Sequence, residues 1–139
     1  MTKTTNYQLP KWEKTDRIQM KDFNDMTAAL DAALAGMPKI VTGTYTGSGT
    51  YNSSGARTLN FSGKPLAVFI LPTDKNDGIG PLILLHGAPW STTNISNDYY
   101  FVRVTWGASS VSWYGTRNEN LMANSSGKTY YYVALLEKQ

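Results

Sequence analysis

Residues 66–71 and 82–85 read Leu-Ala-Val-Phe-Ile-Leu and Leu-Ile-Leu-Leu, and these two apolar runs decide the fold of the chain. Short apolar runs between turn residues are typical of buried β-strands. Successive side chains of a strand point to opposite faces, so both faces of these strands need cover. The run at 130–136, Tyr-Tyr-Tyr-Val-Ala-Leu-Leu, has the same property. A lone sandwich of about 100 residues is too thin to cover both faces, and we therefore expect neighbouring subunits to cover the second one.

Outward from these runs, β-branched residues and turn clusters continue through the second part of the chain. We expect seven strands, at residues 40–46, 57–61, 66–72, 82–86, 99–106, 110–114 and 129–137. Turns that suit positive φ angles are expected at residues 47–49, 52–55, 77–80 and 124–127. The fold class is therefore mainly β: a short N-terminal helix followed by a single antiparallel β-sandwich head at residues 39–139.

Alternation assigns the two faces of the strand at 99–106. Tyr100, Val102, Val104 and Trp106 share the face that we expect to be buried, and the opposite face carries Tyr99, Phe101, Arg103 and Thr105. The same reasoning places Trp113 in the core.

The N-terminal part, residues 1–38, combines an arm with a helix. The first 21 residues show no period, and we expect an extended arm. Asp22 can cap a helix over residues 22–35, which Gly36 and Pro38 end. Apolar residues recur in it at alternating spacings of three and four, as in a coiled coil: Phe23, Met26, Leu30, Ala33 and Met37.

A helix of about four turns is marginal by itself in water, so it must pack on something. It can lie against the β domain of its own chain, or it can join a helix bundle around a symmetry axis. The second alternative makes the five apolar residues the oligomerisation residues of a trimer.

Composition excludes several classes of protein. Hydrophobic residues make up 41% and charged residues 17% of the 139 residues, so the chain should fold. The net charge of +3 comes from 13 basic and 10 acidic residues scattered along the chain, which argues against a nucleic-acid partner. There is no Cys, and no stretch suits a signal peptide or a membrane span, so we expect a cytosolic origin and no membrane insertion.

Part of the chain is similar to a known family. The stretches Asn-Tyr-Gln-Leu-Pro-Lys-Trp-Glu at 6–13, Thr-Asp-Arg at 15–17 and Asp-Phe-Asn at 22–24 resemble the N-terminus of tail fibre proteins of phages and prophages from Gram-positive hosts. Leu-Asp-Ala-Ala-Leu at 30–34 resembles the helical segment that follows in them, so this match covers residues 6–36.

The β domain is similar to the head domain of many tail fibres. The opening is carried by residues 43–50, 57–61 and 64–70, and the ending by Leu121, Asn124, Ser125, Gly127 and residues 130–135. Phe-Ser-Gly-Lys-Pro at 61–65 departs from the family, which more often has Gly-Phe before Lys-Pro. Apart from the ending residues just named, residues 73–125 match no pattern of the family.

The resemblance implies a homotrimeric fibre component of the virion tail, made in the host cytoplasm and extracellular after lysis. Its N-terminal arm would attach to a tail or baseplate protein, and its head would contact a glycan or protein of the host surface. Ligand loops of such a head would be expected in the unmatched middle of the domain.

Residues for catalysis or metal binding are scarce. His86 is the only histidine, no Gly-x-Ser-x-Gly elbow is present, and the chain is too short for a polysaccharide-cleaving groove around acids such as Asp74 and Asp98. Residues 74–78 partly resemble a calcium loop, but Leu85 stands where the closing Glu would be. We expect no enzyme, no cofactor and no metal; a hydrolase remains a minor alternative.

Aromatic residues supply the candidate binding surface. Flat rings stack on sugar faces, and Trp90 lies in a predicted loop among amides and hydroxyls. The candidate ligand-binding residues are Trp90, Tyr99, Tyr114 and Arg117; the alternative for the three rings is that they fill the core. The leading hypothesis is adhesion to the host surface; the alternative is a purely structural baseplate or tail component that binds no host ligand.

Overall fold

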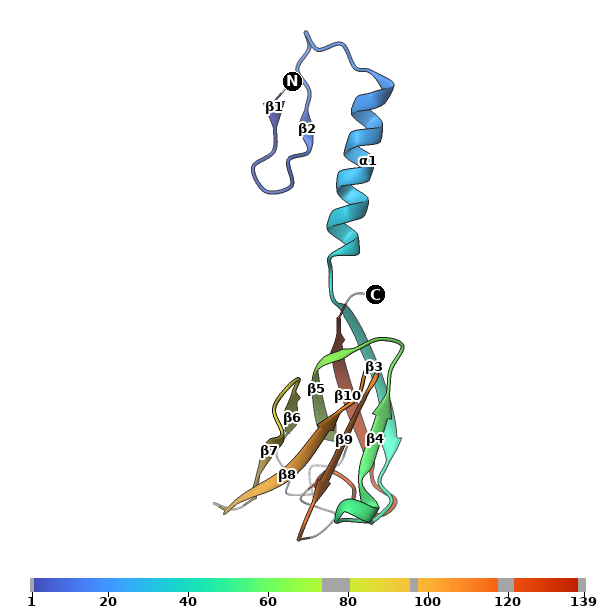
Figure 1. Ribbon diagram of the computed structural model, residues 1–139, viewed down its shortest axis with the longest axis vertical. Coiled ribbons are helices and arrows are strands. Elements are labelled where there is room, and N and C mark those ends of the chain that lie inside the picture. Colours follow the sequence, from blue (N-terminus) through green and yellow to red (C-terminus); the bar gives the residue numbers. More distant parts are fainter. Residues whose placement is uncertain (1, 74–80, 96–97, 118–121, 138–139) are drawn as a thin grey trace. The chain divides into compact units, whose positions relative to one another are not determined.

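The computed structural model describes residues 2–73, 81–95, 98–117 and 122–137, with the side chains of residues 93–95 and 98–100 left aside. The chain forms two compact units, Met1–Met37 and Pro38–Glu137. The first unit contains the one α-helix of the described residues, and the second consists mainly of β-strands (Figure 1). The predicted fold class, mainly β with a short N-terminal helix and an antiparallel sandwich, is confirmed.

The arm of the first unit contains a small antiparallel hairpin, which the sequence did not predict. Its strands are β1 (Thr2–Lys3) and β2 (Pro10–Lys11). The backbone N–H of Thr4 donates to the carbonyl of Leu9 at 2.9 Å, and the Thr4 hydroxyl accepts from the Leu9 N–H at 2.9 Å. Strands of two residues are too short to leave a period in the sequence, which is why alternation could not reveal them.

Helix α1 spans Met20–Ala35 and begins two residues earlier than predicted. Gln19 is the N-cap residue, and the Asp22 carboxylate accepts a hydrogen bond of 2.8 Å from its backbone N–H. Asp22 therefore caps the helix from its third position, as in a capping box, and not as the N-cap itself. The helix ends at Ala35 as predicted, where the Gly36 N–H bonds back to the carbonyl of Ala32 at 3.2 Å.

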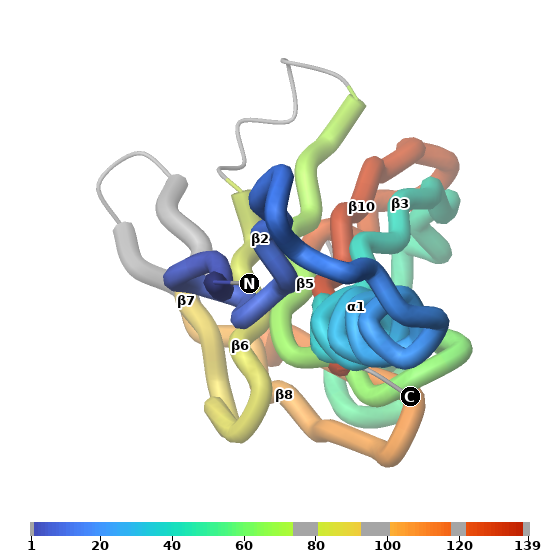
Figure 2. Tube along the Cα trace, turned by 90° about the horizontal axis from the view of Figure 1, so that it is seen from above, coloured from blue at the N-terminus to red at the C-terminus, as the bar shows by residue number. Residues whose placement is uncertain are grey.

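The second unit is a sandwich of two four-stranded antiparallel sheets in the described residues. One sheet has the order β3-β10-β5-β6, which Figure 2 shows end-on, and the other has the order β4-β9-β8-β7. The strands are β3 (Lys39–Thr46), β4 (Arg57–Asn60), β5 (Pro65–Pro72), β6 (Leu82–Leu85), β7 (Trp90–Ile95), β8 (Asp98–Trp106), β9 (Ser110–Gly115) and β10 (Thr129–Leu136); a short 3₁₀ helix, η1, spans Ser53–Gly55. The seven predicted strands are confirmed, each end within one residue.

Strand β7 of the sandwich was not predicted from the sequence, and the placement of Trp90 in a loop was therefore wrong. The polar run after Trp90 looks like a loop, but it forms an edge strand that pairs with β8, with Ser91 opposite Val102. A polar strand at the edge of a sheet lacks the alternation of apolar and polar residues by which a strand is recognised in a sequence.

The core fills the space between the two sheets. Trp113 and Tyr130 are fully buried in it, and the Trp113 indole N–H donates to the Met122 carbonyl at 2.7 Å. Trp106 is partly buried against the same cluster, so both tryptophans pack as predicted. The other large side chains at the centre are Val68, Ile70, Leu82, Leu84, Val102, Val111, Met122 and Leu136.

Two loops at one end of the sandwich are joined by a buried amide. Asn124 is fully buried; its side-chain oxygen accepts from the Ser48 N–H at 3.0 Å, and its amide donates to the Thr50 carbonyl at 2.9 Å. Gly49 and Gly127 have positive φ angles of 73° and 72°, as the turn composition predicts. The turn predicted at 77–80 lies outside the described residues.

Candidate functional site

An aromatic hollow lies on the outer face of the β4-β9-β8-β7 sheet. It has a volume of about 380 Å³ and is lined by Trp90, Phe101, Arg103 and Thr116. Trp90 and Phe101 are 54% and 60% exposed, although both are large apolar side chains. Their ring centroids are 5.5 Å apart at an interplanar angle of 77°, an edge-to-face pair that makes an apolar wall.

The turn between β6 and β7 positions Trp90. Gly87 has a φ of 87°, and the Ala88 N–H donates to the Leu85 carbonyl at 3.0 Å. The Ala88 carbonyl accepts from the indole of Trp106 at 3.1 Å. Pro89 is also bonded to β8, since its carbonyl accepts a hydrogen bond from the Val104 N–H at 2.9 Å. Hydrogen bonds to β8 thus fix the two residues that precede Trp90, and so set where its indole enters the hollow.

Strand pairing brings three side chains into one row. Trp90 on β7 lies opposite Arg103 on β8, and Arg103 lies opposite Tyr114 on β9. Opposed residues of an antiparallel pair share a face of the sheet. Val102 and Val104, on either side of Arg103, are buried, so the row stands on the outer face.

The predicted binding residues separate in the structure. Trp90 lines the hollow, whereas Tyr114 shares its row but is partly buried against the core. Arg117 is exposed and is not among the lining residues, and the side chain of Tyr99 lies outside the described residues. Phe101, Arg103 and Thr116 were missed as site residues, although the alternation of the strand at 99–106 had already placed Phe101 and Arg103 on the outer face.

A second surface, which we call the apolar sheet face, lies on the outer side of the β3-β10-β5-β6 sheet. Phe69 lies opposite both Val133 and Ile83, and Leu71 lies opposite Tyr131, so the residues form rows across the strands. All are 40% to 68% exposed, and the face consists of Ile40, Phe69, Leu71, Ile83, Leu85, Tyr131 and Val133. The prediction that β5, β6 and β10 are apolar on both sides is confirmed, since Val68, Ile70, Leu82, Leu84 and Ala134 fill the core from the inner side.

The apolar sheet face is large for a surface left to water. The seven residues are each 40% to 68% exposed, which leaves on the order of 600 Å² of side-chain surface in water. That value is at the upper end of the largest patch on a typical soluble monomer.

A third apolar surface follows helix α1. Phe23, Leu30 and Met37 are 46%, 40% and 59% exposed, and no residue of the helix is buried. Met26 and Ala33 of the predicted stripe are half-buried. Leu34, which the predicted stripe did not include, is 65% exposed.

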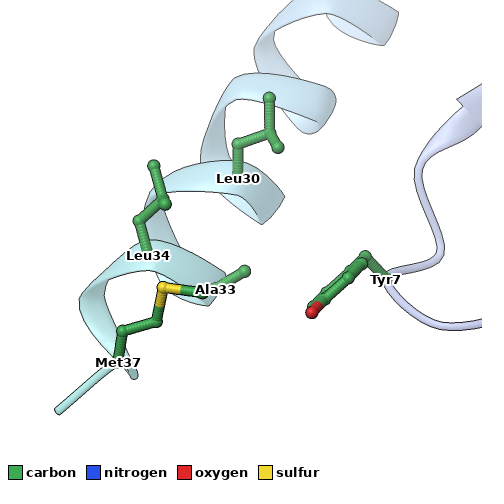
Figure 3. Close-up of a pocket in the computed structure, with 5 residues that line it drawn as sticks. All are labelled: Tyr7, Leu30, Ala33, Leu34 and Met37. Atoms are coloured by element: carbon green, nitrogen blue, oxygen red, sulfur yellow. The ribbon is translucent and has the colours of Figure 1, made fainter.

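The arm of the first unit lies along part of this stripe. The rings of Trp12 and Phe23 are 5.7 Å apart. Figure 3 shows Tyr7, from the loop between β1 and β2, extending towards the helix across a hollow of about 200 Å³. Leu30, Ala33, Leu34 and Met37 line the helix side of that hollow.

Among the described residues, no cluster of three or more His, Cys, Asp or Glu side chains could hold a metal ion. His86 is exposed, with its ring 4.9 Å from that of Trp106. Asp74 and the side chain of Asp98, the acids considered for a hydrolase, lie outside the described residues, as does the calcium-like loop at 74–78.

In the described part of the chain no helix combines the length and hydropathy needed to span a bilayer. Comparison of the chain with protein-family models, with curated proteins and with solved structures finds no match. The aromatic hollow and the two apolar surfaces are therefore the features from which a function can be inferred.

Proposed function

We propose that this chain is a homotrimeric tail fibre or receptor-binding component of a phage-type tail, which adheres to a glycan of the host surface. The observation that carries the proposal is the apolar sheet face. It leaves roughly 600 Å² of apolar side chain in water, and seven exposed residues on four paired strands make it.

Association of copies of the chain would remove this surface from water. Specific interfaces bury about 800 Å² on each partner, and the apolar sheet face supplies most of that area before the exposed residues of α1 are counted. Both surfaces belong to every copy, so a closed rotational assembly can bury them all. The similarity of residues 6–36 and of the head opening to tail fibre proteins favours three copies and a location in the virion tail.

In this proposal one sheet of the sandwich associates with other copies and the other sheet binds the ligand. The apolar sheet face and the aromatic hollow lie on the outer sides of different sheets, so burying the first leaves the second open. Three hollows on one assembly can engage a repetitive cell-surface polymer together, which raises avidity by about 10²–10⁴ over one weak site.

Oligomeric state is the first test. Light scattering on the full chain should return a trimer, and Phe69→Lys or Leu71→Lys should release monomers, because a charge on the apolar sheet face cannot be desolvated cheaply. The matched control is Thr105→Lys, since Thr105 is exposed on the outer face of the other sheet. A wild-type chain that stays monomeric at high micromolar concentration would contradict the proposed trimer.

Adsorption of particles is the second test. Particles carrying Trp90→Ala should assemble normally but adsorb poorly to host cells. Normal adsorption together with failed tail assembly would instead indicate a structural component that never contacts a host ligand.

A further inference from the structure

We infer that the aromatic hollow binds a sugar ring that carries an anionic group, a carboxylate or a phosphate, with Arg103 as the residue that recognises the charge. The inference rests on the proposed adhesion function and adds to it the class of ligand and the role of a residue. Three properties of the hollow carry it: the exposed rings, the Arg103 side chain among the lining residues and the fixed backbone that carries both.

The rings indicate a ligand with an apolar face. Trp90 and Phe101, in edge-to-face contact, each leave more than half of their surface exposed, and both line the same hollow. The C–H face of a pyranose ring fits such a wall, because ring-stacking needs a flat apolar surface with polar groups around its rim. The hollow of about 380 Å³ is at the small end of ligand pockets, about 300–1,000 Å³.

Arg103 supplies the charge. It lines the hollow beside both rings and lies directly opposite Trp90 in the β7–β8 pairing. None of the described carboxylates pairs with Arg103, and no described ring lies under its guanidinium. A guanidinium offers parallel N–H donors that match a carboxylate or a phosphate in two bonds at once. A neutral sugar would supply no counter-charge to this guanidinium.

The strand ladder fixes the backbone that carries Arg103. Val102 and Val104 are anchored in the core on either side, with exposures of 0% and 7%, so the backbone of Arg103 cannot shift without disturbing the core. Trp90 is fixed in the same way by the Ala88 and Val104 hydrogen bonds described above. The backbone that carries each of the two contacting side chains is thus preorganised, which reduces the entropy that binding costs.

Titration of the full chain tests the inference, with Trp fluorescence as the readout. The probes are a neutral oligosaccharide and two derivatives of the same backbone, one with a uronic acid and one with a phosphate ester. At least one anionic probe should bind ten-fold or more tighter than the neutral one, and the difference should shrink with added salt. The two anionic arms identify which group the site prefers.

The variants separate the two contacts. Arg103→Gln should abolish the preference for the anionic probe, and Arg103→Lys should retain part of it because the charge remains without the planar fork. Trp90→Ala should lower the affinity for all three probes. Lys39→Gln, which removes a positive charge at an exposed position of β3, should leave all three affinities unchanged. Thermal unfolding of each variant verifies that the fold is kept.

Equal affinity for neutral and anionic probes, a preference that survives in Arg103→Gln, or no binding of any probe would overturn the inference. The proposed function can fail separately. If Trp90→Ala abolishes adsorption while neutral sugar competes as well as anionic sugar, adhesion stands and the ligand class is wrong. If the anionic probe binds as expected but Trp90→Ala particles adsorb normally, the ligand class stands and the adhesion role is wrong.

Discussion

The hydroxyl of Tyr45 donates a hydrogen bond of 2.7 Å to the carbonyl oxygen of Ala123, a residue with a φ of 55°. Both residues are buried, and their contact joins β3 to the loop before β10. The ring of Tyr45 also stacks on Tyr130 with centroids 5.2 Å apart. A polar group thus holds an unfavourable backbone conformation in place within the core.

Tyr45→Phe should lower the free energy of unfolding by about 1–3 kcal/mol, because the Ala123 carbonyl loses its partner while it stays buried. Urea unfolding at neutral pH measures the change. Tyr131→Phe is the matched control, since Tyr131 is 58% exposed on the neighbouring strand β10. Equal effects of the two substitutions would mean that the Tyr45 bond contributes nothing.

Tyr45 should also make the free energy of unfolding depend on pH. Burial, and next the nearby Tyr130, raise the pKa of the Tyr45 hydroxyl far above its ordinary value, although Arg57 opposes the shift. Because the raised pKa belongs to the folded state, the stabilisation is complete below the unfolded pKa of about 10 and is lost as pH rises above it. The free energy of unfolding should therefore fall above pH ~10, and less steeply in Tyr45→Phe. An unchanged slope would contradict the assignment.

Asn124→Ala should destabilise the sandwich by about 2–3 kcal/mol, because the Thr50 carbonyl and the Ser48 N–H both lose a partner. Thermal and urea unfolding report the loss. Asn60→Ala, at an exposed position of β4, should stay within about 0.5 kcal/mol of the wild type. If Asn124→Ala is as mild as Asn60→Ala, water replaces the amide without cost.

Gly47→Ala should cost about 2–3 kcal/mol through overpacking. A Cβ at Gly47 would clash with the carbonyl oxygen of Ser125, which is backbone and cannot turn away. Gly127→Ala is a contrast, since its Cβ would meet nothing within 4 Å and only the positive φ of 72° opposes it. We expect about 1–2 kcal/mol for Gly127→Ala, and the reverse ranking would contradict the close approach at Gly47.

Val68→Ala and Val133→Ala compare the two faces of one sheet. Val68 is fully buried, so its truncation should cost about 2–3 kcal/mol at every protein concentration. Val133 is 44% exposed in the single chain, so its truncation should matter mainly where copies associate. Urea unfolding at two protein concentrations distinguishes them; a concentration-independent loss at Val133 as large as that at Val68 would argue against burial between subunits.

The sequence by itself determined the elements that have a local period or a local stop signal. The double apolarity of residues 66–71 and 82–85 already implied an inner and an outer apolar face, and Val68 and Phe69 occupy these two faces. Helix α1 was found because the spacing of its apolar residues and the stop at Gly36 are local properties. Alternation alone placed Phe101 and Arg103 on the outer face of β8.

Only the tertiary structure decided the pairings, because a strand's partner depends on residues far away in the chain. The polar edge strand β7 exists through its ladder with β8, and that ladder sets Trp90 opposite Arg103. Asn124 looks like an ordinary turn residue in the sequence, yet the approach of the loop at 47–49 buries it. A local pattern specifies which face a side chain takes, whereas the neighbours across that face are set by long-range pairing, whose free energy is gained only when the whole sandwich closes.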